Sequence, residues 1–317
     1  TMNKLISIVT PCFNEKDNID ELCERIRTTM AGLSYRYEHI FIDNCSTDGT
    51  VKKIKEIAAQ DKRVKLIVNI RNFGHIKSPY YALLQSRGDA CVLIASDLQD
   101  PPEMIKEFIE KWEEGFNTVL AVKPESKESP LMFFIRKVYY KLITRISEIP
   151  LVKNATGAGL FDRKVIEILR KLDDPYPYFR GLVCEVGGPI ATVPFTQPRR
   201  TRGVTKNNFF TLFDLAMLGI TNHSKIPLRL MTMAGFSISV ISFLVAIGFL
   251  IAKIIFWNSF VLGIAPLVIG LFFFSAVLTF FMGILGEYIG AIHTQIRNMP
   301  LVIEAERVNF DKDLGGN

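Results

Sequence analysis

Residues 90–103 read ACVLIASDLQDPPE, and they place an apolar run directly before a group of polar side chains. The run over residues 90–95 predicts a buried strand, and the proline pair that follows the polar group predicts the start of a helix. Asp97, Gln99 and Asp100 lie in the turn between strand and helix. This succession of strand, polar turn and helix decides the fold class of the N-terminal part of the chain.

The same succession recurs through the first 122 residues. Short apolar runs predict strands over residues 5–10, 39–43, 64–68, 90–95 and 118–122. Runs with helical spacing predict helices over residues 14–30, 47–59, 76–86 and 104–114. Strands that alternate with helices indicate an α/β domain with a mainly parallel sheet.

Several of these strands end at a residue suited to binding. Four of these strands end in, or are soon followed by, a residue of this kind: Pro11, Asp43, Asn69 and Asp97. Because parallel sheets bind their ligands at the carboxyl ends of the strands, we expect these residues to converge.

The last third of the chain has a different composition. The chain has 317 residues, 49% of them hydrophobic, and a mean hydropathy of +0.22. Residues 230–252 and 254–286 contain no charged residue, and each run exceeds the about 20 residues that span a bilayer. Positive residues flank the pair on both sides: Lys225, Arg229 and Arg297. The positive-inside bias therefore predicts two transmembrane helices in the inner or plasma membrane, with both termini in the cytoplasm.

These boundaries predict four parts. They are an α/β domain over residues 1–206, an interfacial amphipathic helix and linker over 207–228, two transmembrane helices over 229–290, and a cytoplasmic tail over 291–317. An apolar stripe along residues 209–220 favours the interfacial helix. Residues 130–150 form a second basic amphipathic pattern, which a membrane surface and packing on its own domain explain equally well.

Charge and cysteine content narrow the classes of function. The net charge of +6 fits an anionic partner such as a nucleotide, a lipid head group or a membrane surface, and we expect no nucleic acid partner. The five cysteines are an odd number without a CxxC pair, which argues against a disulfide framework or a zinc site.

The turn after residue 95 is the first candidate for chemistry. Asp97 and Gln99 are two residues apart and suit one Mg²⁺ or Mn²⁺ ion, since both metals prefer oxygen ligands. Asp100 fits either a position in the site or a cap on the following helix.

The turns after the first two strands are the second candidate. Pro11 and Glu15 could hold a nucleobase and ribose, and Asp43 could accept a hydrogen bond from either. A capped helix start, with Asn14 or Asp17 as the cap, explains the first turn as well. Asp48 and Thr50 are expected to stabilise the second turn.

Taken in order, the motifs TPCFNE, DNCSTDGT, RNFGH, SDLQDPPE, TGAGLFDRK and RRTRGVTK resemble those of inverting glycosyltransferases with a GT-A fold. The nearer resemblance is to dolichol-phosphate mannose synthase and the GtrB-like bacterial glucosyltransferases, which act on polyprenyl phosphates. The motifs cover about the first 210 residues. The paired apolar runs and the segment GILGEYIG also resemble the GtrB-like group.

The resemblance implies roles for individual residues. Pro11, Glu15 and Asp43 would bind the uridine part of a nucleotide-sugar, and Asp97 and Gln99 would bind the metal. Lys123 would meet a phosphate group. Arg202 and Lys206 would clamp the donor pyrophosphate or the lipid phosphate, unless they are ordinary positive charges beside a membrane.

The sequence departs from the family at two places. The common metal motif Asp-Ala-Asp-Leu-Gln is Ala95-Ser96-Asp97-Leu98-Gln99 here, so one carboxylate is missing. Relatives often have an aspartate near the start of residues 154–159, where this chain has none. Ala155 is the candidate for a replaced catalytic aspartate.

The resemblance implies transfer of a hexose, with glucose from UDP-glucose as the first expectation, to undecaprenyl phosphate at the cytoplasmic face. The missing carboxylates motivate an alternative, a catalytically silent nucleotide-sugar-binding scaffold of a glycosylation complex. His75 and Lys77 suit contacts to the donor sugar or phosphate, although a cap or core role is favoured for His75. Because two spans alone bury little surface, a homo-oligomer is a further expectation.

Overall fold

The computed structural model of the chain describes residues 4–123, 152, 154–172, 174–175, 177–196, 226–256, 264–297 and 299–310. The sheet in this part has eight strands in the order β7-β5-β6-β4-β1-β2-β3-β8. They are β1 Leu5–Cys12, β2 Arg36–Asp43, β3 Val64–Asn69, β4 Ala90–Leu93, β5 Thr118–Val122, β6 Ala155–Asp162, β7 Ile190–Pro194 and β8 Glu304–Val308. Only β6 and β8 run against the others. The predicted α/β domain with a mainly parallel sheet is confirmed.

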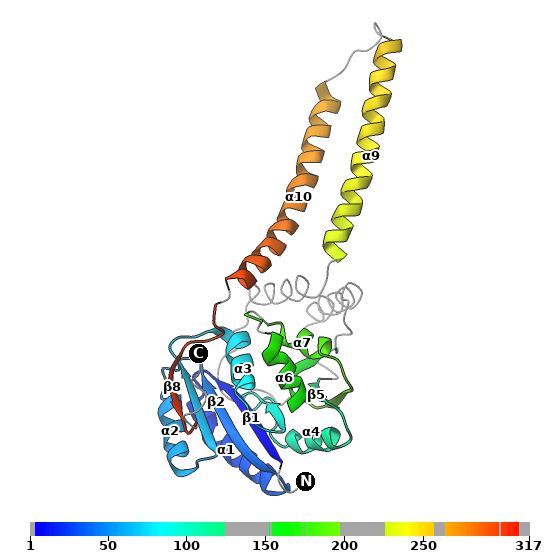
Figure 1. Ribbon diagram of the computed structural model, residues 1–317. Coiled ribbons are helices and arrows are strands. Elements are labelled where there is room, and N and C mark those ends of the chain that lie inside the picture. Colours follow the sequence, from blue (N-terminus) through cyan, green and yellow to red (C-terminus); the bar gives the residue numbers. More distant parts are fainter. Residues whose placement is uncertain are drawn as a thin grey trace.

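Helices cover both faces of this sheet (Figure 1). They are α1 Lys16–Ala31, α2 Thr50–Gln60, α3 Gly74–Leu84, α4 Met104–Glu113, α6 Arg163–Leu172 and α7 Phe179–Glu185. Buried side chains of α1, α2 and α4 share one core, and those of α3, α6 and α7 share the core on the other face. Every strand and helix predicted over the first 122 residues is present, with ends shifted by three residues or fewer.

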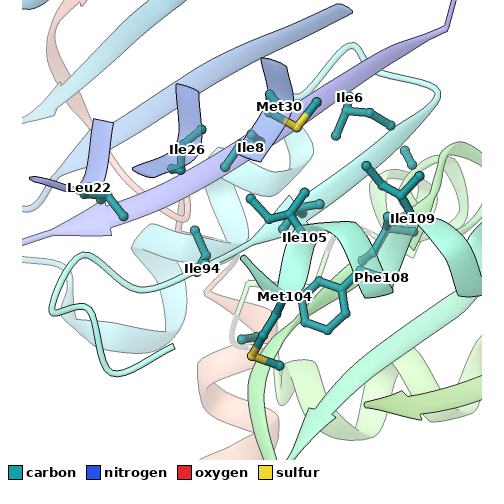
Figure 2. Close-up of a cluster of buried hydrophobic side chains, with 14 of the residues drawn as sticks. Ile6, Ile8, Leu22, Ile26, Met30, Ile94, Met104, Ile105, Phe108 and Ile109 are labelled. Carbon is teal, nitrogen blue, oxygen red and sulfur yellow. The ribbon is translucent and has the colours of Figure 1, made fainter. Parts of the chain in front are cut away.

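The core on the α1 and α4 side explains why these helices form where they do. Leu22, Ile26 and Met30 recur at helical spacing on α1 and are at most 2% exposed. Figure 2 shows them in one cluster with Ile6 and Ile8 of β1 and with the side chains that α4 contributes to the same core. Burying each large apolar side chain stabilises the fold by about 1.5–3 kcal/mol. This core therefore holds the sheet rigidly, including the edge at which a site would lie.

The strand order creates a crevice at that edge. β1 pairs with β2 on one side and with β4 on the other, both in parallel. The chain thus reverses its direction of travel across the sheet between β3 and β4. Such a switch point opens a crevice at the carboxyl ends of the two central strands, which are β1 and β4 here.

The C-terminal residues return to the sheet, which the sequence did not predict. β8 lies in the region expected to be a tail and pairs with the edge strand β3. Arg307 on β8 donates hydrogen bonds to the Tyr81 hydroxyl, at 3.0 Å, and to Gln85 Oε1, at 2.9 Å. These bonds tie the C-terminal strand to α3 and its C-terminal end.

Between β7 and β8 the chain forms two long apolar helices, α9 Ile226–Ile255 and α10 Ile264–Ile296. Figure 1 shows them extending together away from the sheet. Helices of 30 and 33 residues measure roughly 45 and 50 Å. Within the described residues, one stretch is long and apolar enough to cross a membrane by length and composition, Phe273–Ile296, with a mean hydropathy of 1.6. Ile226–Ile238 is a shorter apolar helical stretch.

Some predictions fall outside the described residues. They are the amphipathic helices over residues 130–150 and 209–220, and the basic residues Arg202, Lys206 and Lys225.

A buried histidine in the sheet makes stability depend on pH. His39 is 2% exposed, its Nε2 lies 2.9 Å from Thr10 Oγ1, and burial lowers its pKa to about 3. The unfolded chain takes up a proton on this residue below its ordinary pKa of 6.5, whereas the folded chain does not. The His39 contribution to stability is therefore complete above pH 6.5 and is lost as the pH falls toward 3.

We predict that the free energy of unfolding falls by about 1.4 kcal/mol per pH unit below pH 6 because of His39 alone. The His39→Gln variant, which keeps a polar group near Thr10 and does not titrate, should show a slope shallower by that amount. Urea titrations of both proteins in detergent between pH 7.5 and 5 measure it. Equal slopes in the two proteins would contradict the prediction.

Candidate functional site

The loops after β1 and β2 interlock at the carboxyl edge of the sheet. Asn14 adopts a left-handed backbone conformation, with φ of 57°. Its amide N–H donates to Ser46 Oγ at 2.8 Å, and its side-chain Oδ1 accepts from the Thr47 N–H at 2.8 Å. A short polar side chain tolerates this conformation better than most others. The two loops therefore form one surface.

The residues expected to bind uridine lie at or just beneath this surface. Pro11 pairs with Ile42, and the next residue of β1 pairs with Asp43, so both side chains come from adjacent strand ends. Asp43 is fully buried, and its Oδ2 accepts from the Ser46 N–H at 2.8 Å. Burial raises the pKa of Asp43, and the hydrogen bonds from Ser46 partly offset this. The structure thus offers a held carboxylate beside Pro11.

Glu15 lies at the start of α1, next to the same loops. Its backbone N–H donates to Thr50 Oγ1 at 3.0 Å, and the following N–H, of Lys16, donates to Asp48 Oδ2 at 3.2 Å. These two side chains satisfy the first N–H groups of α1 from a neighbouring loop. Neither Asn14 nor Asp17 caps the helix, because Glu15 holds the cap position without a side-chain cap. Asp48 also bonds Thr50 within its own loop, as the turn role predicted.

The loop after β4 holds the two residues expected to bind a metal. Asp97 and Gln99 are both partly exposed, and the Gln99 N–H donates to Asp97 Oδ1 at 3.1 Å. Leu98 between them has φ of 58°, a strained conformation for a branched apolar residue. No group of three His, Cys, Asp or Glu side chains gathers in the part of the chain that the structure describes. The donor set therefore fits a divalent ion that completes its shell with phosphate oxygens and water.

A cavity of about 260 Å³ opens beside these loops, at the switch point between β1 and β4. Its walls come from the ends of β1 and β4, the start of β6, and helices α3 and α7. The lining residues are Pro11, His75, Ile76, Pro79, Tyr80, Leu93, Ile94, Ala95, Asp100, Thr156, Gly157, Ala158, Pro177, Tyr178, Phe179 and Arg180. The lining is mainly apolar, with few charged groups.

Asp100 is the carboxylate of this cavity, and it does not cap α4. The cap position of α4 is Glu103, and no side chain caps the helix there. Asp100 is 8% exposed, and its Oδ1 has no hydrogen-bond partner among the described residues. Burial and the charge of Asp97 raise its pKa to about 6, while Lys123 and Arg180 act in the opposite direction. Asp97, Lys123 and Arg180 are therefore each close enough to influence Asp100.

Lys123 follows β5 and lies beside the start of β6. The Lys123 N–H donates to the Asn154 carbonyl at 3.1 Å, and Val122 pairs with Ala155. Ala155 is 8% exposed and faces a smaller recess bounded by Leu120, Val183 and Arg180, among others. The larger cavity is lined instead by the three residues that follow Ala155.

Sequence reasoning missed one cavity residue, Arg180, and expected another, His75, in a different role. Arg180 comes from α7, a helix that the sequence did not predict, and its Nη2 donates to the Thr156 carbonyl at 2.9 Å. His75 was favoured as a cap or core residue. It is instead exposed at the cavity wall, near the start of α3, whose cap position is Phe73. Partial burial and the nearby Arg180 lower the pKa of His75.

Comparison with known proteins shows the family of the chain. The profile described as Glycosyl transferase family 2 matches residues 7–169. The uncharacterized glycosyltransferase YkcC of Bacillus subtilis is 35% identical over 300 residues, which cover 94% of this chain and 92% of that protein. The bactoprenol glucosyl transferase of Shigella phage SfII is 34% identical over 299 residues, covering 94% and 96%.

Among solved structures, mannosyl-3-phosphoglycerate synthase from Rubrobacter xylanophilus is similar over 68% of this chain and 71% of that chain, with 17% identity and a TM-score of 0.47. The family profile covers just over half of the chain, and the relatives match it almost from end to end at about one third identity. The chain therefore belongs to glycosyl transferase family 2 and is a glycosyltransferase with the α/β, GT-A-type domain that its motifs implied.

Proposed function

We propose that the chain transfers glucose from UDP-glucose to undecaprenyl phosphate, with inversion, at the cytoplasmic face of the membrane. One observation carries the proposal: the cavity adjoins both the Pro11 and Asp43 loops and the Asp97 loop. A nucleotide on the first pair of loops would direct its diphosphate toward the second. The attached sugar would then lie at the cavity. The bactoprenol glucosyl transferases among the relatives support the choice of acceptor and sugar.

The nucleotide site follows from the buried acceptor at the end of β2. Asp43 is held by Ser46 and suits a hydrogen bond from a base N–H or a ribose hydroxyl. Pro11 and Glu15 complete the corner. Lys123 lies near enough to Asp100 to lower the pKa of that carboxyl, and it would meet a phosphate group.

The proposed reaction does not need a strong general base. The nucleophile is a phosphate oxygen of the lipid, and a phosphate monoester has a second pKa near ~6, so it is largely an anion at neutral pH. The protein must align donor and acceptor and stabilise the departing diphosphate. A Mg²⁺ or Mn²⁺ ion bound by Asp97 and Gln99 would supply positive charge for that purpose.

Membrane attachment by two spans and a short interfacial segment belongs to the same proposal. α9 begins and α10 ends on the side of the sheet domain, and β8 returns the chain to the sheet. Lys77 of α3 lies near the end of α10, where burial and the positive charges of Arg71 and Arg297 lower its pKa and Asp174 partly offsets this. A group of positive charges at this place suits anionic head groups. Arg202 and Lys206 are proposed to add to it, and a homo-oligomer would enlarge the attachment.

One observation favours a second candidate, a silent nucleotide-sugar-binding scaffold. The metal loop has Ala95 in place of a first aspartate, and the described residues show no group of three acidic, cysteine or imidazole ligands there. Such a protein would bind the donor without turning it over.

We predict that this chain moves radiolabelled glucose from UDP-glucose to undecaprenyl phosphate in detergent with Mg²⁺ or Mn²⁺. Asp97→Asn should lower kcat/KM by about 100-fold or more, because it removes the carboxylate that is proposed to bind the metal. Asp89→Asn, at the opposite end of β4, is the matched control and should leave the rate unchanged. UDP-glucose binding without any transfer would favour the scaffold instead.

A separate prediction concerns Ala155. If a carboxylate at this position orients the acceptor, Ala155→Asp should raise kcat by roughly 10-fold or more and leave the affinity for UDP unchanged. Ala155→Asn has the same shape without the charge and should not raise the rate. Because Ala155 lies among apolar side chains beside Arg180, the variant's thermal unfolding must be measured as well. A folded Ala155→Asp protein with an unchanged rate would exclude residue 155 as the place of the missing carboxylate.

A further inference from the structure

The cavity holds two charged side chains of opposite sign on walls that are otherwise mainly apolar. Asp100 comes from the loop after β4, and Arg180 comes from α7. Prolines and aromatic rings form much of the remaining lining, among them Pro79, Tyr80 and Tyr178. This composition is unlike that of the neighbouring loops, where polar groups dominate.

Asp100 has hydrogen-bonding capacity that the described residues do not use. Its carboxyl accepts from the backbone N–H of Ala95, which closes the loop that carries Asp97 and Gln99. Its Oδ1 is out of contact with water and has no partner in the described part of the chain. A buried acceptor without a donor costs free energy, so the arrangement needs a reason. A ligand donor at the cavity wall is such a reason.

Arg180 is held in place on the same cavity. One of its five N–H groups is accounted for by the Thr156 carbonyl, at 2.9 Å from Nη2. That bond fixes the guanidinium against the start of β6. Since Arg180 lines both the cavity and the smaller recess beside Ala155, it lies between the two.

The two charges together select a class of ligand. A phosphate group in the cavity would be repelled by Asp100, and a cation would be repelled by Arg180. A hydroxyl group satisfies both, because it donates to a carboxylate and accepts from a guanidinium. The C–H face of a sugar ring also suits proline and aromatic walls. The cavity therefore fits a neutral ligand with several hydroxyl groups.

We propose that Asp100 and Arg180 bind a hydroxyl group of the donor's hexosyl unit and so determine which hexose the protein accepts. This inference rests on the proposed function and adds a specificity site to it. It also separates two tasks in space: the diphosphate is bound by the loops with Asp97 and Lys123, and the sugar ring by the cavity.

Binding measurements test the proposal without depending on turnover. Isothermal titration would compare UDP, UDP-glucose and the 2-, 3-, 4- and 6-deoxy forms of UDP-glucose, each with Mn²⁺. We expect at least one deoxy donor to bind the unmodified protein about 10- to 100-fold more weakly than UDP-glucose. In Asp100→Ala this difference should vanish, while the affinity for UDP stays the same. Arg180→Gln should reduce the same difference.

Two further variants separate a specific role from a structural one. Asp100→Asn keeps the shape and an acceptor oxygen, so it should keep part of the discrimination that Asp100→Ala loses. Asp89→Asn should behave like the unmodified protein. If Asp100→Ala weakens UDP and all UDP-sugars equally, Asp100 acts only on the metal loop and the proposal is wrong.

Failure of this inference can be told from failure of the proposed function. Tight binding of UDP-glucose with equal affinity for every deoxy form would overturn the sugar site alone. No binding of UDP or of any UDP-sugar by the unmodified, folded protein would overturn the proposed donor, and the sugar site with it.

Discussion

The parallel pairing of β1 with both β2 and β4 is the constraint on which the site depends. The chain adds β2 and β3 on one side of β1 and then places β4 on the other side. The connection from β3 to β4, which contains α3, must therefore cross β2 and β1. Crossovers between parallel strands keep one hand, so a connection that travels in the opposite direction lies on the opposite face. α3 indeed packs in the core opposite that of α1 and α2. The cavity opens at this switch point, beside the ends of β1 and β4.

The parts of this arrangement that are local in sequence could be predicted. The first five strands are short apolar runs with helices between them, and their spacing alone placed them within three residues. Pro11, Asp43, Asp97 and Gln99 could be assigned to one edge because all follow parallel strands. β6 could not be recognised in this way, since Gly157 and Gly159 interrupt it and it is an antiparallel strand inserted between β4 and β5. Gly159 is needed there, because a Cβ would lie 2.3 Å from the Val119 carbonyl oxygen.

Residues that join the site from distant segments were the ones that sequence reasoning missed. Arg180 reaches the cavity from α7, whose seven residues give too short a pattern to recognise. β8 has five residues, three of them charged, and its partner strand lies more than 230 residues earlier. Its contribution is physical rather than chemical: it covers the exposed edge of β3, and its Arg307 holds Tyr81 of α3. Contacts with β8 thus hold α3, the helix that contributes His75, Pro79 and Tyr80 to the cavity.

Charge distribution in the proposed site would keep an anionic nucleophile apart from an anionic leaving group. Lys123 and a metal ion held by Asp97 and Gln99 would provide positive charge for phosphate at the rim, whereas the buried carboxylate of Asp100 makes the cavity unsuitable for phosphate. The cavity lining is mainly apolar, which disfavours ordered water where the sugar would lie. Water is the competing nucleophile in any sugar transfer, so an apolar cavity would protect the donor until a lipid phosphate arrives. In the proposed reaction such a site gains from attachment beside a membrane, because the lipid phosphate would reach it along the bilayer surface.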